Sequence, residues 1–167
     1  MVSFFCETGV DSLNSSMRNQ NNDSLNYIAI FSYNPNTPND SWSSYNPNLP
    51  SWAVQQISNL NRQKGYWVKM NSTGTYYKQG YLFMSTNIVL SSGWNLVGYP
   101  ANDERNISTS LQSLSYTEVH SNQYNNLTNT SYWYVHTPPS SGNLTTTTPM
   151  KGYWINSSTT QTWTVTG

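Results

Sequence analysis

Short runs of alternating apolar and polar residues follow one another along most of the chain. They are rich in aromatic and β-branched residues, and Gly, Pro, Asn or Ser stands at their ends, which is typical of strands that close in turns. The clearest runs read NIVL, WNLVGY, GYWVKM, YLFM, SYWYVH, GYWIN and TWTVTG. This pattern predicts a mainly β protein of antiparallel strands, folded as a sandwich or in a barrel-like form.

Helical spacing occurs in only two stretches of the sequence. In residues 106–114, Ile107, Leu111 and Leu114 stand at i, i+4 and i+7, which places them on one face of a helix. Residues 51–60, with the sequence SWAVQQISNL, are a second candidate for a short helix. We therefore expect one short helix in each half of the chain.

The tetrapeptide KGYW occurs at residues 64–67 and again 87 positions further on, at residues 151–154. The runs after the two copies have equal length and both end in glycine. Upstream, YIAIFSYN parallels YTEVHSNQ and DSWSSYNPN parallels TSYWYVHTP. The sequence therefore predicts two tandem related repeats, residues 1–80 and residues 81–167.

The two predicted repeats begin differently. The second opens with TNIVLSSGWNLVGYP, whereas the first opens with MVSFF, which parallels only the later VGYP part of that segment. The first repeat is therefore expected to lack its N-terminal GWN strand. The gap could accept a strand from a neighbouring copy in a head-to-tail assembly, or it could reflect a truncated chain.

The repeated motifs have a simple physical reading. A glycine before Tyr-Trp lets the backbone turn or approach a neighbouring strand closely. Alternation along the strand then sends the tyrosine and the tryptophan to opposite faces, one inward and one toward a rim. We assign these motifs a structural role, and their residues are Gly65, Tyr66, Trp67, Gly93, Trp94, Asn95, Gly152, Tyr153 and Trp154.

Composition narrows the choice of partners. Only 8% of the residues are charged and the net charge is zero, which argues against nucleic acid and against an anionic membrane surface. No apolar run approaches the length of about 18 residues that spans a bilayer, so we expect no membrane insertion of this segment.

Abundant Asn, Ser, Thr and Tyr suit an extracellular β-rich surface. The opening residues do not read as a signal peptide, so export would require one that has been removed.

Catalytic chemistry finds little support. His120 and His136 have no partner at metal-binding or catalytic spacing, and Cys6 stands alone, as a buried thiol or an intermolecular bridge. The acidic residues are scattered as Glu7, Asp11, Asp23, Asp40, Asp103, Glu104 and Glu118. We therefore expect no enzyme and no cofactor. Calcium bound by the NDERN or NPNTPND loop stays an open alternative.

The densest motif is the N-glycosylation acceptor N-x-[ST]. It occurs at Asn14, Asn22, Asn39, Asn71, Asn106, Asn126, Asn129, Asn143 and Asn156. A chain this rich in Asn, Ser and Thr contains many such triplets by chance. Used as acceptors, they would hydrate a surface that has almost no charge.

The chain resembles a repeat of archaeal and bacterial cell-surface proteins, which are S-layer-like, sheath or adhesin-like. The resemblance rests on L-x-x-GWNLVGYP, a Ser/Thr-rich helix, W-x-x-Y-x-P, KGYW and a closing TVTG. These motifs are carried by Leu90, Gly93, Trp94, Asn95, Leu96, Val97, Pro100, Trp42, Tyr45, Pro47, both GYW triplets and Gly167. The resemblance implies an exported, mostly β module without a catalytic centre.

Two functions follow as expectations. The first is a structural, self-assembling subunit of an extracellular layer, sheath or filament, N-glycosylated, whose partners are its own copies or other cell-surface proteins. The alternative is a carbohydrate-binding or adhesin module that contacts glycans through exposed aromatic rings. Its candidate platforms are Trp42, Tyr45, Trp52, Tyr132, Trp133 and Tyr134.

Overall fold

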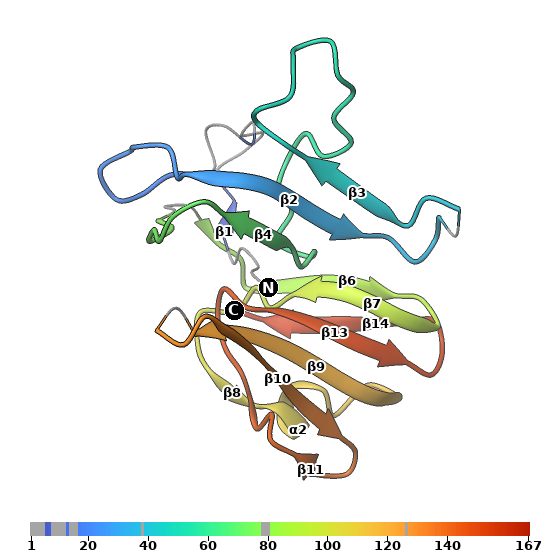
Figure 1. The fold of residues 1–167 in the computed structure, drawn as a ribbon. Coiled ribbons are helices and arrows are strands. Elements are labelled where there is room, and N and C mark those ends of the chain that lie inside the picture. The colour runs from blue at the N-terminus through green and yellow to red at the C-terminus, as the bar shows by residue number, and fades with distance from the viewer. Residues whose placement is uncertain (1–5, 8–12, 14–16, 38, 78–80, 126) are drawn as a thin grey trace.

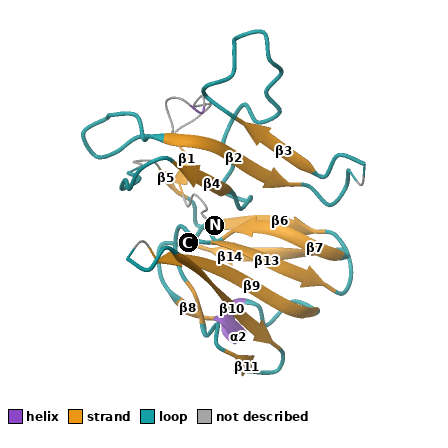
Figure 2. Ribbon diagram, viewed as in Figure 1, coloured by secondary structure: helices purple, strands orange, loops and turns teal. Residues whose placement is uncertain are grey.

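The computed structural model describes residues 6–7, 13, 17–37, 39–77, 81–125 and 127–167. Within these ranges the protein is mainly β, as predicted, and its strands form several antiparallel sheets (Figure 2). The strands of the first half are β1 (Cys6–Glu7), β2 (Tyr27–Tyr33), β3 (Trp42–Tyr45) and β4 (Trp67–Met70). Those that follow are β5 (Tyr81–Leu82), β6 (Ser85–Leu90), β7 (Gly93–Gly98), β8 (Arg105–Asn106), β9 (Tyr116–Asn125), β10 (Thr130–Thr137), β11 (Ser141–Gly142), β12 (Thr146–Thr147), β13 (Gly152–Ser157) and β14 (Gln161–Thr166).

Two larger sheets lie one above the other (Figure 1). The first half forms the sheet β3-β2-β4, and the second half forms the sheet β11-β10-β9-β13-β7. Two-stranded ribbons β14-β6, β12-β8 and β1-β5 complete the described strands. No helix in the described ranges is both long and apolar enough to cross a bilayer.

Each half has its own hydrophobic core. The core of the second half lies between the five-stranded sheet, the β14-β6 ribbon and the short helix α2 (Ile107–Ser110). Its buried residues are Ile88, Leu90, Val97, Tyr99, Ala101, Ile107, Leu111, Val119, Leu144, Tyr153, Ile155, Trp163 and Val165. Among the described residues, the core of the first half contains Leu13, Met17, Tyr27, Ile30, Ile57 and Tyr66.

The two helix predictions have different outcomes. Ile107 begins a helix, but the helix ends at Ser110 and is much shorter than the expected span of 106–114. The prediction for residues 51–60 is wrong, because this stretch forms turns and irregular backbone. The backbone N–H of Gln56 donates to the carbonyl of Ser44 at 3.2 Å, and that of Ala53 donates to Pro50 at 2.9 Å. These bonds replace the i to i−4 ladder that a helix requires.

The two large sheets pair corresponding residues in the same way. The central strand places Phe31 beside Trp67 in the first sheet, and His120 beside Trp154 in the second. On its other side, β2 places Tyr33 beside Trp42, while β9 places Asn122 beside Trp133. The preceding residue of each central strand also has corresponding partners. Ile30 pairs with Val68 and Tyr45 in the first sheet, and Val119 pairs with Ile155 and His136 in the second.

Strand β7 joins the two halves through its backbone. One edge pairs with β13, with Val97 opposite Tyr153. On the other edge, the N–H of Gly65 donates to the carbonyl of Leu96 at 3.2 Å, and the N–H of Gly98 donates to the carbonyl of Gln63 at 3.1 Å. β7 therefore lies between the two KGYW segments.

Candidate interaction site: an aromatic seam between two sheets

The two KGYW segments form the same local structure. Tyr66 and Tyr153 are each only 1% exposed. The hydroxyl of Tyr66 accepts a hydrogen bond from the backbone N–H of Asn61 at 2.8 Å, and that of Tyr153 accepts one from Thr148 at 2.7 Å. Burial raises the pKa of both tyrosines from 10.0 to about 12. Each tyrosine thus fixes the turn that leads into its own strand.

The tryptophan of each segment lies on the opposite face from the tyrosine. Trp67 and Trp154 are partly exposed, whereas the tyrosine before each of them is buried. The two residues thus lie on opposite faces, as the alternation predicted, and the structure shows that the tyrosine is the one that faces inward. The cores therefore lie on the outer faces of the two sheets, and the tryptophans lie on the faces that look toward each other.

The GWN segment positions one more tryptophan on this inner side. Gly93 has a φ of +92°, which a residue with a side chain rarely adopts, and it turns the chain into β7. Asn95 is buried and its amide group donates to the carbonyls of Ser91 and Gly93, each at 2.8 Å. Its side-chain oxygen also accepts from the N–H of Ser91 at 2.9 Å. Trp94, between Gly93 and Asn95, is held partly exposed.

Seven rings form a continuous cluster between the sheets, which we call the aromatic seam: Tyr33, Trp42, Trp67, Trp94, His120, Trp133 and Trp154. It includes five of the chain's seven tryptophans. Three contacts cross from one half to the other. Trp154 meets Tyr33 at 5.1 Å and Trp42 at 5.9 Å between centroids, and Trp67 meets Trp133 at 5.7 Å. Their tilted or edge-to-face geometry is the favourable one for aromatic pairs.

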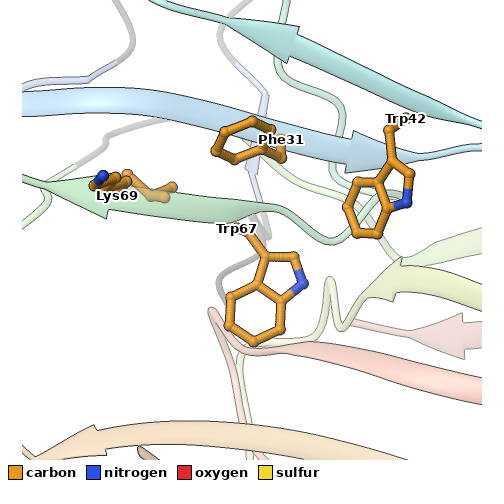
Figure 3. A pocket seen from close by; sticks show the side chains of 5 residues that line it. Phe31, Trp42, Trp67 and Lys69 are labelled. Carbon is orange, nitrogen blue, oxygen red and sulfur yellow. The ribbon is translucent and has the colours of Figure 1, made fainter.

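A first open hollow lies under the β3-β2-β4 sheet (Figure 3). It has a volume of about 460 Å³ and is lined by Phe31, Trp42, Trp67, Val68 and Lys69. Phe31 is 36% and Trp42 46% exposed. Apart from the ammonium group of Lys69, the side chains that line it offer carbon atoms and the indole N–H groups. This surface is suited to an apolar or aromatic occupant.

A second open hollow, of about 350 Å³, lies beside the first along the seam. It is lined by Tyr33, Trp94, His120, Trp133 and Trp154. This hollow has polar groups close by, because Nε2 of His120 lies 2.7 Å from Oε2 of Glu118. Rings next to a histidine–carboxylate pair can combine stacking with hydrogen bonding.

The residues predicted as ligand platforms separate into three groups. Trp42 and Trp133 lie in the seam and are about half exposed. Tyr45 packs against the first core and Tyr134 against the second. Trp52 and Tyr132 are exposed outside the seam, and Trp52 is 83% exposed on the long loop between β3 and β4.

Phe31, Tyr33 and His120 were not among the site residues predicted from the sequence. The signal was present in the alternation of β2, where Ile30 is fully buried and Phe31 is exposed. Alternation shows which residues share a face. It does not show that the exposed faces of two distant sheets meet, because that depends on the pairing of β7 with both KGYW segments.

Most of the described glycosylation candidates are accessible. Asn22, Asn39, Asn71, Asn106, Asn129 and Asn143 are exposed, whereas Asn156 is partly buried on β13. The Oδ1 atom of Asn143 accepts from the N–H of Val135 at 2.8 Å. Asn14 and Asn126 lie outside the described residues.

The charged and titratable groups that the structure describes are mostly engaged locally. Asp103 pairs with Arg105 at 2.8 Å, which lowers the pKa of this carboxyl. His136 is buried, lies 3.0 Å from the Tyr116 hydroxyl, and has its pKa lowered by burial. In the part of the chain that the structure describes, no three His, Cys, Asp or Glu side chains gather in a way that could hold a metal ion.

Comparison of the chain with protein-family models, with curated proteins and with solved structures found no significant match.

Proposed function

We propose that this chain is a structural, self-assembling module of an extracellular cell-surface layer, sheath or filament, built of two related repeats. The observation that carries the proposal is the position of β7. This strand pairs with its own KGYW segment on one edge and with the preceding KGYW segment on the other. Backbone pairing of this kind links neighbouring units and suits proteins built as linear arrays.

The proposed duplication into residues 1–80 and residues 81–167 is supported by strand register. Trp67 and Trp154, 87 positions apart, pair with Phe31 and His120, and Val68 and Ile155 pair with the preceding residues Ile30 and Val119, so the two pairings keep the same register. Both pairings also show an irregularity at their far end, near Tyr27 and near Ser157. Independent folds would not be expected to share register, bulge and buried tyrosine together.

The surface also favours association. The chain has 7 basic and 7 acidic residues among 167, so little charge repulsion separates neighbouring copies. Several large apolar side chains are nevertheless strongly exposed, including Trp52, Val54, Met84 and Val89. Exposed apolar surface of this extent is typical of interaction sites when it is contiguous.

Electron microscopy of the native surface material that contains this chain, together with mass spectrometry, tests the proposal. Ordered sheets or filaments composed of the chain are expected, with added glycan mass on exposed candidates such as Asn22, Asn39 and Asn71. Dispersed monomers in native material would overturn the structural role. If the peptides that contain these asparagines carry no added mass, the proposed glycosylation is wrong, and the proposed assembly is unaffected.

Carbohydrate binding is a second candidate, favoured by the second hollow. Trp133 is 47% exposed there, and the Glu118–His120 pair offers polar groups to sugar hydroxyls. Titration with soluble oligosaccharides, followed by tryptophan fluorescence, tests it. Binding should be lost in Trp133→Ala and kept in Trp52→Ala, because Trp52 lies outside the seam. An unchanged response in Trp133→Ala would remove this candidate.

A further inference from the structure

The loop between β3 and β4 carries the most exposed tryptophan of the chain on an uncharged surface. Trp52 is 83% exposed, Val54 89% and Leu49 46%. No charged residue occurs from Asn46 to Asn61. Exposing these side chains to water is unfavourable, by about 25 cal/mol for each Å² of apolar surface. The loop thus has the composition of a binding element.

The base of this loop is fixed by two glutamines. The side-chain amide of Gln55 donates to the carbonyl of Asn46 at 2.9 Å, and its oxygen accepts from the N–H of the same residue at 3.0 Å. Gln56 accepts from the N–H of Ser44 and donates to Asp40, both at 3.1 Å. A loop held in one shape loses less conformational entropy when it binds.

The loop lies on the opposite side of its sheet from the first hollow. Ile57, near its base, is buried in the core of the first half with Ile30. The hollow is on the other face of β2, where Phe31 points. In Figure 1 the loop after β3 extends away from the sheets of the second half. Trp52 is therefore placed to enter the hollow of another molecule rather than its own.

We propose that the β3–β4 loop of one copy inserts Trp52 into the hollow lined by Phe31, Trp42, Trp67, Val68 and Lys69 of a second copy. This inference rests on the proposed self-assembly and names its interface. An indole ring would stack among the aromatic side chains, and the ammonium group of Lys69 would lie against its face as a cation–π partner. Leu49 and Val54 would cover the rim of the hollow.

The chemistry of the hollow favours this occupant over a sugar. A sugar brings several hydroxyl groups, and each needs a hydrogen-bond partner when it leaves water. Lys69 is the only charged side chain that lines the hollow. An indole needs one partner at most and fits apolar walls. The polar Glu118–His120 pair belongs to the second hollow.

The geometry of the contact has a direct consequence for assembly. The loop and the hollow are different surfaces on opposite sides of the same sheet, so the contact is heterologous. Heterologous contacts that do not close into a ring give open chains of subunits. The contact thus predicts filament growth rather than closed dimers.

Sedimentation of the purified chain over a range of concentrations tests the proposal. The wild type is expected to form a series of oligomers, and Trp52→Ala is expected to weaken association at least about tenfold, as for an interface hot spot. Leu127→Ala is the matched control, since Leu127 is 96% exposed in the other half of the molecule. This control should assemble like the wild type.

A complementation experiment separates the interface from effects on folding. Trp52→Ala keeps its hollow, and Phe31→Ala keeps its loop. At a concentration where the wild type is oligomeric and each variant alone is monomeric, an equal mixture should form dimers and nothing larger, because one loop and one hollow remain functional.

The other outcomes also decide the question. A Trp52→Ala variant that assembles like the wild type overturns this interface and leaves assembly through another surface. A wild type that stays monomeric at every concentration overturns the inference, and native surface material then decides the proposed function. If chitohexaose dissociates the oligomers, and if it binds to Trp52→Ala but not to Phe31→Ala, the hollow is a sugar site and the proposed interface is wrong.

Discussion

The first and second halves of the molecule share a strand register but differ in what supports it. In both, a buried tyrosine anchors the turn before the strand, β4 or β13, and the tryptophan after it faces the seam. In the part of the chain that the structure describes, the second half adds β7, the β14-β6 ribbon and α2, with thirteen buried core residues behind its KGYW segment. Six buried core residues are described in the first half. The KGYW corner, meaning the buried tyrosine with its turn and tryptophan, thus forms in front of two different cores, which makes it the common element of the two halves.

The largest expected effect contrasts two aromatic residues that are 87 positions apart. Trp163 is 1% exposed, stacks on Tyr99 at 6.1 Å and donates its indole N–H to Ser110. Trp163→Ala should reduce the free energy of unfolding by about 4 kcal/mol. Tyr76→Ala should reduce it by about half as much, because Tyr76 is only partly buried. Urea unfolding measures the loss of free energy in both variants. Equal losses would show that the two aromatic residues contribute equally to their cores and would contradict the prediction.

The second prediction concerns the backbone junction of the halves. A Cβ at Gly65 would lie 2.7 Å from the carbonyl oxygen of Val97 and 2.8 Å from Cδ1 of Leu96. Gly65→Val should therefore cost about 3 kcal/mol through overpacking. Gly74→Ala is the control, since its Cβ meets the ends of flexible side chains. If Gly65→Val unfolds at the same urea concentration as the wild type, the pairing with β7 is not important for stability.

The third prediction uses alkaline pH to compare the buried tyrosines of the two KGYW segments. An unfolded tyrosine releases its proton near pH 10, whereas Tyr66 and Tyr153 keep theirs until about pH 12. The unfolded chain therefore binds fewer protons between these values, and stability falls as pH rises. The loss should be about 2–3 kcal/mol for each tyrosine.

Urea unfolding at a series of alkaline pH values measures this loss. Tyr66→Phe and Tyr153→Phe should each reduce the slope by a similar amount, because burial raises the pKa of both hydroxyls to about 12. If the slope of stability against pH changes in only one of the two variants, the tyrosines of the two KGYW segments differ in burial.

The smallest expected effect is the coupling across the seam. A double-mutant cycle on Trp67 and Trp133 should give a coupling energy of about 1 kcal/mol, since their rings meet edge to face at 5.7 Å. The same cycle on Trp42 and Trp154, at 5.9 Å, should give a similar value. If the losses of unfolding free energy are additive in both cycles, the rings of the two halves do not stabilise each other across the seam.

Local features of this fold were readable in the sequence because they depend on neighbouring residues. The alternation in GYW predicted that Tyr66 and Trp67 face opposite sides, although it did not say which of them is buried, and the turn residues marked most strands. Residues 51–60 do not form the predicted helix, because Gln55 and Gln56 bond to the end of β3 rather than to a helix backbone. Side-chain bonds between separate segments leave no periodic signal.

The candidate site was only partly predictable for a related reason. Trp42 and Trp133 were among the six predicted platform residues, because alternation along a strand turns at least one ring of an aromatic run outward. Phe31 and Lys69 join them only because β2 and β4 present one face to the second half. Contacts between faces depend on how the halves are joined, and the two backbone bonds to β7 are part of that junction.

The position of β7 also gives the molecule a mechanical direction. Its hydrogen bonds to residues 63–65 and to β13 run across the strand axis on both sides. A force along β7 loads these bonds together in shear, whereas a force across it opens them one after another. The junction therefore resists tension in one direction and opens readily in the other, so the orientation of the module under load would determine its strength.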